Sequence, residues 1–359
     1  MGHCRKKMIT LLMTNTCNLN CKYCYVEKDI GKIKTIDINF AKNGIKDYFQ
    51  NNNSPAIRFF ADGEPTLAFK EIKLLKDYAQ SISNKKVIFE IQTNGCFNEE
   101  IRNWLAENMD IIFISLDGPP EINDKLRGNS DLVEDNLKFL AKFKNLTLGV
   151  RATITSLNND KQIELINYLK ELGVNILFVD LVFAKVGEEA TDIGVDYKKF
   201  IDKYLEAYKY SKNKNFFYST MFASNFDEEV ECGCRACLPT PHLTVDGYVS
   251  CCDMCTSGNS SLNELIYGKF IENENRIEYY QEKINNIKLR NKFNIPECIE
   301  CEIKDYCAGA CLGEALNETN NILGVKKETC LAIKYLWEKL GKKQIKLKYL
   351  HPWECLREC

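Results

Sequence analysis

Apolar runs and amphipathic stretches alternate along the first half of the chain. The apolar runs are short and rich in β-branched and aromatic residues, which is typical of buried strands. They cover residues 8–14, 56–61, 86–93, 110–116, 146–155 and 174–183. Segments with helical spacing lie between and after them, at residues 37–52, 66–83, 98–107, 132–144, 159–172 and 195–212.

Several of these expected helices carry suitable terminal residues. Asp37, Asn98 and either Asn158 or Asn159 are candidate N-caps, because their side chains can accept a hydrogen bond from a free amide of the first turn. Gly173 is a candidate C-cap. The alternation predicts a parallel sheet built from βαβ units. Six units are too few for a closed eight-stranded barrel, so we expect an α/β fold with a curved partial (β/α)6 barrel.

Polar motifs follow the first four expected strands. Ligands bind at the carboxyl ends of the strands in such sheets, so we expect these motifs to share one site. The residues concerned are the cysteines of the first loop, then Glu64, Asn94 and Ser115.

The loop after the first strand contains Cys17, Cys21 and Cys24 in a CxxxCxxC spacing. Iron–sulfur clusters normally take four cysteine thiolates, so a compact trio predicts a [4Fe-4S] cluster with one iron open to a small molecule. A zinc site is the first alternative, although zinc sites usually pair two CxxC units or add histidines. The chain has three histidines and none lies in this loop. Unligated thiols are the second alternative.

This loop, with Tyr23 before its last cysteine, resembles the radical S-adenosylmethionine (SAM) superfamily. Ala61–Pro65 reads ADGEP and resembles the GGEP loop of that family, with Asp62 in place of a glycine. Gln92–Gly95 and Ser115–Pro119 follow in the family's order. The resemblance covers residues 8 to about 185. It implies the partial barrel and a cluster that binds SAM.

The resemblance also implies the chemistry. The cluster reduces SAM to methionine and a 5′-deoxyadenosyl radical, which removes a hydrogen atom from the substrate. Glu64 suits the amino group of SAM, Ser115 and Asn94 suit its hydroxyl or carboxylate oxygens, and Arg151 could pair with its carboxylate. Tyr23 joins this cofactor-binding set. Helix capping by Glu64 and Ser115 and a surface ion pair of Arg151 are the alternatives.

A second constellation of cysteines lies in residues 232–330, which hold eleven of the eighteen cysteines. Its order, C-x9-G-x4-C, then CxxCx5CxxxC and a last cysteine, resembles the SPASM domain of peptide- and protein-modifying radical SAM enzymes. The matching positions are Cys237, Gly247, Cys252, Cys298, Cys301, Cys307, Cys311 and Cys330.

The SPASM resemblance implies two auxiliary [4Fe-4S] clusters, three clusters in all. One would use Cys298, Cys301, Cys307 and Cys330. The other would use Cys237, Cys252, Cys311 and an upstream cysteine, either Cys232 or Cys234, of which Cys232 is preferred. Zinc ribbons are the alternative, and a purely structural role for one or both clusters stays open because metal ligation stabilises small domains. No ligand role is assigned to Cys4, Cys96, Cys251, Cys255, Cys355 and Cys359.

Two aspartates are candidates for the general base that an oxidation needs. Asp253 directly follows Cys252, where the related anaerobic sulfatase-maturing enzymes have their proposed base. Asp117 lies at the mouth of the expected sheet.

Composition limits the partners and the compartment. The net charge of −2 argues against a nucleic-acid surface. No apolar stretch reaches the ~20 residues of a membrane span, and the short run near the start does not resemble a signal peptide. Eighteen cysteines without a secretory signal favour metal binding in the cytoplasm. We expect a barrel over residues 1–212, a linker over 213–231, a SPASM domain over 232–341 and a tail over 342–359.

The resemblance implies a peptide or protein substrate and an external one-electron reductant of the flavodoxin or ferredoxin type. We expect an oxidative crosslink such as a thioether, with conversion of cysteine or serine to formylglycine in a sulfatase as the alternative. Only 16 residues precede Cys17, which leaves no room before it for a leader-binding module. An iron–sulfur electron carrier without catalysis is the alternative from another class.

Overall fold

The computed structural model describes residues 8–24, 26, 34–53, 55–183, 192–226 and 229–340. Strands and helices alternate through its first half. The strands are β1 Ile9–Leu12, β2 Ala56–Phe60, β3 Ile88–Thr93, β4 Ile111–Ser115, β5 Thr147–Ile154 and β6 Ile176–Leu181. The helices are α1 Ile38–Asn51, α2 Phe69–Ile82, α3 Glu99–Asn108, α4 Pro120–Leu126, α5 Ser130–Leu140, α6 Gln162–Glu171 and α7 Tyr197–Lys212.

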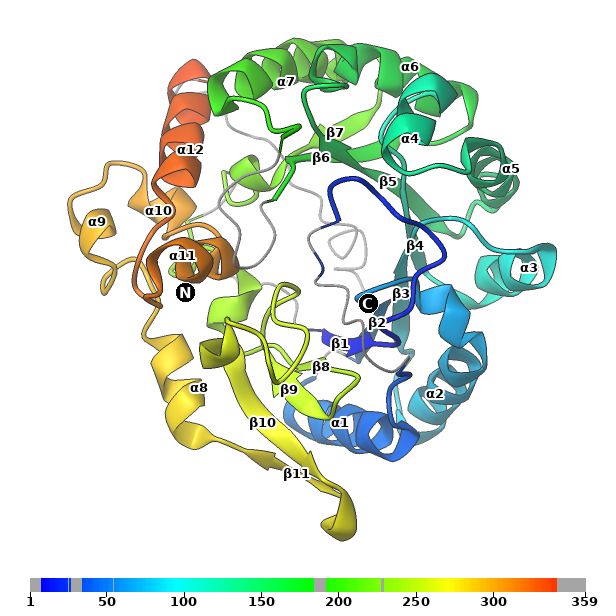
Figure 1. Cartoon of the computed structure of the whole chain (residues 1–359), viewed down its shortest axis with the longest axis vertical. Helices are drawn as coiled ribbons and strands as arrows, with labels where there is room; N and C mark the ends of the chain where they lie inside the picture. Colours follow the sequence, from blue (N-terminus) through cyan, green and yellow to red (C-terminus); the bar gives the residue numbers. More distant parts are fainter. Residues whose placement is uncertain are drawn as a thin grey trace.

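Strands β1 to β6 pair in parallel in their order along the chain, which confirms the predicted α/β class and the (β/α)6 arrangement. The sheet curls, and the helices cover its outer side (Figure 1). The segment between β4 and β5 differs from the prediction, because it forms two helices instead of one over 132–144. Gly128 and Asn129 separate them with φ angles of 95° and 57°, which no α-helix accommodates.

The helix caps follow the sequence at most of the expected positions. Asp37 accepts a hydrogen bond from the amide of Phe40 at 2.8 Å, and Asn98 accepts one from Ile101 at 3.0 Å. Gly173 follows α6 with φ 85°. The N-cap expected at Asn158 or Asn159 is wrong, because Lys161 takes the N-cap position of α6. The side chain of Asn158 instead accepts from the amide of Thr155 at 2.7 Å, just after β5.

The segment that we predicted as a linker, residues 213–231, contributes to the sheet. Strand β7, Phe217–Ser219, pairs in parallel with β6, and a 3-10 turn, η3 Met221–Ala223, follows it. The strand is only three residues long, which is too short to show as an apolar run in the sequence.

The cysteine-rich half continues the same sheet on its other side. Strand β8, His242–Leu243, pairs in parallel with β1, and β9 Tyr248–Ser250, β10 Ile266–Ile271 and β11 Arg276–Tyr279 follow as antiparallel neighbours. Within the part of the chain that the structure describes, the sheet therefore has eleven strands in the order β11-β10-β9-β8-β1-β2-β3-β4-β5-β6-β7. The later helices are α8 Gln281–Lys288, α9 Pro296–Ile299, α10 Lys304–Cys307, α11 Leu312–Thr319 and α12 Lys327–Leu340.

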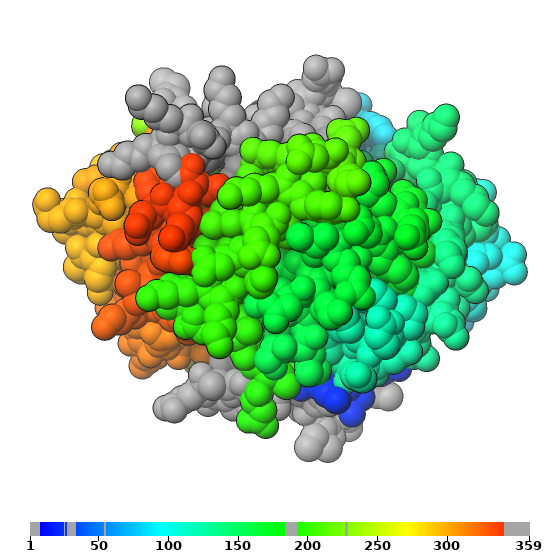
Figure 2. All heavy atoms as spheres, turned by 90° about the horizontal axis from the view of Figure 1, so that it is seen from above, coloured from blue at the N-terminus to red at the C-terminus, as the bar shows by residue number. Residues whose placement is uncertain are grey.

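Helix α12 packs against α7 and so links the end of the described chain to the barrel. The hydroxyl of Tyr335 donates to Asp202 at 2.9 Å, and its ring meets that of Tyr197 edge-on. Figure 2 shows the two helices side by side on one face. The predicted tail, with Cys355 and Cys359, lies outside the described residues, as does Cys4. No helix among the described residues has the length and apolar character that a membrane crossing requires.

Candidate active site and cluster sites

The polar motifs that follow the first strands line one cavity of about 390 Å³, together with residues from β5, β6 and the cysteine-rich half. The loops therefore converge as the strand pattern predicts. The sequence-predicted site residues on its wall are Cys17, Cys21, Tyr23, Cys24, Glu64, Asn94, Ser115, Arg151, Cys252, Asp253 and Cys311. Asp117 is not among its lining residues.

The cysteine loop packs directly on the loop after β2. The amide of Glu64 donates to the carbonyl oxygen of Thr16 at 2.8 Å. A Cβ on Gly63 would lie 1.9 Å from that oxygen and 2.8 Å from the amide nitrogen of Cys17. Glycine at position 63 is therefore required for the two loops to meet.

The carboxylate of Glu64 is buried and accepts four hydrogen bonds. Oε1 accepts from the amide and hydroxyl of Thr66, at 3.1 and 2.7 Å, and from the hydroxyl of Thr93 at 2.6 Å. Oε2 accepts from the amide of Asn94 at 2.7 Å. Burial raises the pKa of Glu64 in spite of these bonds. Oε1 therefore caps the turn that begins at Pro65, as the capping alternative expects. Oε2 accepts one hydrogen bond and can accept another from the amino group of a ligand.

Asn94 faces the cysteine loop. Its side-chain amide donates to Asn18 at 2.7 Å and lies 4.0 Å from the sulfur of Cys17, and its oxygen accepts from the amide of Cys96 at 2.8 Å. Through these contacts the Asn94 side chain holds the cysteine loop in place. This role differs from the contact with SAM that we expected from the sequence.

Asp117 is fully buried and joins the loop after β4 to the cysteine loop. One oxygen accepts from the hydroxyl of Tyr23 and from Nε of Arg127, the latter at 2.9 Å. The other accepts from the amide of Thr153 at 2.8 Å. A carboxylate with all these partners and no access to the cavity is a positioning group. The expectation of a general base at Asp117 is not met by this geometry, and Tyr23 is likewise held through its hydroxyl.

Arg151 and Ser115 lie at the ends of neighbouring strands on the cavity wall. Nη2 of Arg151 pairs with Asp180 at 3.0 Å, and the Arg151 side chain is 41% exposed. Asp180 is fixed in turn by the amide of Met221 at 2.7 Å. The ion pair orients the guanidinium and leaves its other nitrogens available for a carboxylate. Ser115 is half-buried beside it.

Asp253 lies among basic side chains on the wall of the cavity. Its carboxylate pairs with Arg58, lies 2.8 Å from Nε2 of His242 and 3.7 Å from Arg235. Burial alone would raise the pKa of Asp253, but Arg58 and His242 hold it well below its usual range. His242 also has its Nδ1 2.8 Å from the carbonyl oxygen of Thr240. Asp253 is therefore an ionised carboxylate on the cavity wall.

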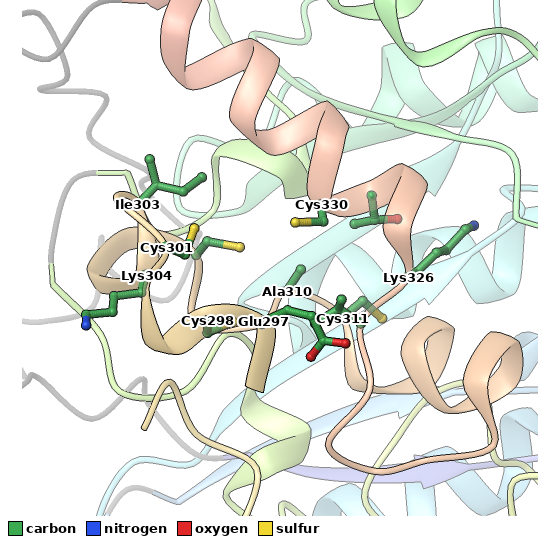
Figure 3. A pocket seen from close by; sticks show the side chains of 13 residues that line it. Glu297, Cys298, Cys301, Ile303, Lys304, Ala310, Cys311, Lys326 and Cys330 are labelled. Atoms are coloured by element: carbon green, nitrogen blue, oxygen red, sulfur yellow. The ribbon is translucent and has the colours of Figure 1, made fainter. Parts of the chain in front are cut away.

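Five cysteines of the second constellation line a second, small pocket. Cys298, Cys301, Cys307 and Cys330 lie on its wall with Ile303 and Lys326, and Cys311 of the other predicted set lines it as well. Figure 3 shows Cys330, on α12, directed across the pocket towards the segment that carries Cys301. Burial raises the pKa of Cys298 to about 11 and that of Cys307 to about 12, so both thiols are neutral without a metal.

The other predicted set is brought together by two glycines. A Cβ on Gly233 would lie 2.6 Å from the backbone of Ala310 and 2.7 Å from the carbonyl oxygen of Cys307, so the Cys232–Cys234 segment rests on the loop that leads to Cys311. A Cβ on Gly313 would lie 2.9 Å from the sulfur of Cys252. The sulfurs of Cys234 and Cys237 are 3.9 Å apart.

The choice between Cys232 and Cys234 now has a geometric criterion. Cys234 lines the main cavity together with Cys252 and Cys311, whereas Cys232 is not among its lining residues. Cys234 therefore lies on the same cavity wall as Cys252 and Cys311 of the predicted set. We propose Cys234 as the upstream ligand, in place of Cys232, which the sequence favoured.

Residues 11–172 match the sequence profile of the radical SAM superfamily. This part of the chain is a radical SAM domain.

Longer similarities extend beyond this domain. The chain is 26% identical over 368 residues to the radical SAM cyclopropyl synthase TigE of Paramaledivibacter caminithermalis, covering 93% of this chain and 74% of that protein. It is 24% identical over 323 residues to the cysteine-type anaerobic sulfatase-maturating enzyme of Clostridium perfringens, covering 82% and 85%. The structure of anSMEcpe with bound AdoMet and Kp18Cys peptide superposes with a TM-score of 0.75 at 20% identity, covering 93% and 96%, which shows a shared fold.

A radical SAM domain implies a [4Fe-4S] cluster, and the loop thiols fit one by their chemistry. Cys17, Cys21 and Cys24 all reach the cavity wall. Burial raises the pKa of the Cys17 and Cys21 thiols, while the amide of Leu19, 3.4 Å from the Cys17 sulfur, and the guanidinium of Arg127 act in the opposite direction and favour thiolate. Among the described residues, no three His, Cys, Asp or Glu side chains are arranged to hold a single metal ion.

Sequence reasoning did not single out several polar residues on the wall of this cavity, among them Arg127, Asp180, Arg235 and His242. Arg127 lies shortly after the SLDGP segment, and Asp180 ends β6, so strand-end position is a signal that could have found Asp180. Arg235 lies between Cys234 and Cys237, and its place on the cavity wall has no counterpart in the sequence pattern. His242 lies in a two-residue strand, too short to be expected from the sequence.

Proposed function

We propose that the protein uses SAM radical chemistry to oxidise a residue of a peptide or protein substrate and form a crosslink such as a thioether. The observation that carries the proposal is the shared cavity, in which the cysteine loop faces Asp253 and Cys252 from the cysteine-rich half. The similarity to a cyclopropyl synthase and to a structure with a bound peptide supports a peptide as the substrate class.

A [4Fe-4S] cluster with an open iron, when bound, supplies the reductive cleavage of SAM that yields the 5′-deoxyadenosyl radical. The chain holds this cluster with Cys17, Cys21 and Cys24. Arg151, oriented by Asp180, receives the SAM carboxylate, and Oε2 of Glu64 receives the amino group. Ser115 lies beside them for a hydroxyl contact.

Oxidation of the substrate releases a proton, which we assign to Asp253. Its carboxylate is ionised and is the acidic group on the cavity wall that lies against His242. The pair with Arg58 makes Asp253 a weak base, so the proton passes to it from an acidic substrate intermediate. Two auxiliary [4Fe-4S] clusters and a one-electron reductant of the flavodoxin or ferredoxin type, in the cytoplasm, belong to the same proposal.

The first test is SAM cleavage. The protein is reconstituted anaerobically with iron and sulfide and reduced with dithionite, and 5′-deoxyadenosine is measured by chromatography. We expect the wild type to form 5′-deoxyadenosine. Cys21→Ala should form none, because the two thiolates that remain in its loop are too few to hold the cluster. Cys96→Ala is the matched control, since Cys96 is a buried thiol near the same loop without an expected ligand role. Cleavage by Cys21→Ala would contradict the site assignment.

Formylglycine formation is the second candidate, favoured by the similarity to a sulfatase-maturating enzyme. With cysteine as the target residue, the two reactions differ in the mass of the product: a crosslink removes about 2 Da and conversion of cysteine to formylglycine about 18 Da. Conversion of serine to formylglycine also removes about 2 Da, so the test uses mass spectrometry of peptides that carry a cysteine as the target. An electron carrier would give neither product, and it would form no 5′-deoxyadenosine with a fully loaded loop cluster.

A further inference from the structure

Arg127 connects three groups at the edge of the cysteine loop. Its Nη1 lies 3.9 Å from the sulfur of Cys21, within hydrogen-bond reach of a sulfur acceptor. Its Nε donates to Asp117 at 2.9 Å, and its guanidinium lies 5.3 Å from the centre of the Tyr23 ring. The side chain is only 13% exposed, so the charge is held close to the sulfur.

The backbone fixes this arrangement. Arg127 directly follows α4, and its amide donates to the carbonyl of Asn123 at 2.7 Å. The amide of Lys22 donates to the carbonyl of Leu126 at 3.0 Å, so the cysteine loop is tied to the same helix end. The guanidinium therefore keeps its place beside Cys21 through contacts on both sides.

We propose that Arg127 sets the reduction potential of the cluster held by the cysteine loop. The inference rests on the proposed function, because it takes Cys21 as a cluster ligand. When the cluster takes one electron from the external reductant, its negative charge grows by one, and a cation at a ligand sulfur stabilises that reduced state. A hydrogen bond to the sulfur acts in the same direction. Both effects raise the potential.

Asp117 carries the opposite charge to Arg127 and provides a second test of the proposal. Its buried carboxylate neutralises part of the charge of Arg127 and also accepts from the hydroxyl of Tyr23 in the cysteine loop. Removing the positive charge with Arg127→Gln should lower the potential, and removing the negative charge with Asp117→Asn should raise it. A loss of loop structure would lower the cluster content of both variants. It would not shift their reduction potentials in opposite directions.

The experiment is a redox titration of the reconstituted full chain, followed by electron paramagnetic resonance. The relevant signal is the one that changes when SAM is added, which separates the loop cluster from the auxiliary ones. Iron and sulfide are counted for each variant. We expect the midpoint potential to shift negative in Arg127→Gln, less in Arg127→Lys, which keeps the charge, and positive in Asp117→Asn. Arg276→Gln, on the exposed strand β11, is the control and should match the wild type.

The outcomes separate the inference from the proposed function. A wild type without a SAM-sensitive signal contradicts the proposed function itself. A wild type with that signal, together with a fully loaded Arg127→Gln at unchanged potential, overturns only the role of Arg127. If Arg127→Gln does not load, Asp117→Asn decides, and an unchanged or lower potential in that variant overturns the inference.

Discussion

Gly63 and Thr16 are in backbone contact across two loops that are far apart in the sequence. The space between them is so small that a Cβ on Gly63 would stand 1.9 Å from the Thr16 carbonyl oxygen. Gly63→Ala must therefore push the cysteine loop away. We expect a loss of about 1–3 kcal/mol in the free energy of unfolding, as for other overpacked sites, and a loss of iron at the loop. Chemical denaturation and iron analysis measure both.

A matched control separates the contact from the general cost of replacing a glycine. Gly173→Ala lies at the end of α6 with φ 85°, and its Cβ would meet only the Ala141 side chain. It should cost about 1 kcal/mol through its backbone conformation and leave the loop iron intact. Equal iron loss in both variants would show that the contact at Thr16 is not what positions the cysteines.

Replacement of Gly233 by alanine should also be destabilising, but it should affect the cysteine-rich half and not the cysteine loop. Its Cβ would overlap the backbone of Ala310 and Cys307, so Gly233→Ala separates the upstream cysteines from the loop that carries Cys311. Because metal binding couples to folding, we expect a lower iron content and a lower melting temperature of the cysteine-rich half. Cys301→Ala should also lower the iron content, but only by the iron bound in the pocket that Cys301 lines. A Gly233→Ala variant with full iron content would contradict the predicted ligand set.

The ion pair of Arg58 and Asp253 predicts non-additive stability effects. Arg58 is 6% exposed, and removing it leaves a charged Asp253 without its main partner. Arg58→Gln should cost about 2 kcal/mol, less than a fully buried pair, because the Asp253 side chain is 35% exposed to the cavity. The double variant Arg58→Gln/Asp253→Asn should recover part of the loss, since the carboxylate that Arg58 neutralised is then absent. A double-mutant cycle from urea denaturation measures this, and additive losses would contradict it.

The barrel was predictable because its signals are local. Each of β1 to β6 is an apolar run of its own, and Asp37 and Asn98 mark helix starts within a few residues of the caps that they form. The strand-end position of Glu64 and Ser115 follows from the same pattern. The sequence therefore predicted which residues would share a cavity.

The rest depends on contacts between distant segments. Strands β7 and β8 are too short to appear as patterns, yet β8 joins the cysteine-rich half to β1 and brings His242 to Asp253. Burial of the carboxylate of Asp117 arises from Tyr23, Arg127 and Thr153, which lie on three different segments. Local pattern cannot reveal such partners, and this is why Asp117 was expected at the cavity and Arg127 was missed.

Asp62, which stands where the resembling family has glycine, predicts a pH-dependent stability. Burial raises its pKa to about 7, with Asp246 and Asp253 adding to the rise. The folded state thus keeps a proton on Asp62 at pH values where the unfolded chain, with an ordinary pKa of about 3.9, has lost it. Stability therefore falls as pH rises from about 4, and the penalty is complete once the pH exceeds 7.

Asp62→Asn removes this titration without changing the shape of the side chain. Relative to the wild type, the variant should gain about 1 kcal/mol between pH 6 and pH 8, because one pKa unit corresponds to about 1.4 kcal/mol and part of the side chain reaches the cavity. Asp77→Asn, on the exposed face of α2, is the control and should follow the wild type at both pH values. Anaerobic chemical denaturation at the two pH values measures the difference. Parallel curves for Asp62→Asn and the wild type would mean that Asp62 is ionised in the folded protein over this pH range, which contradicts the prediction.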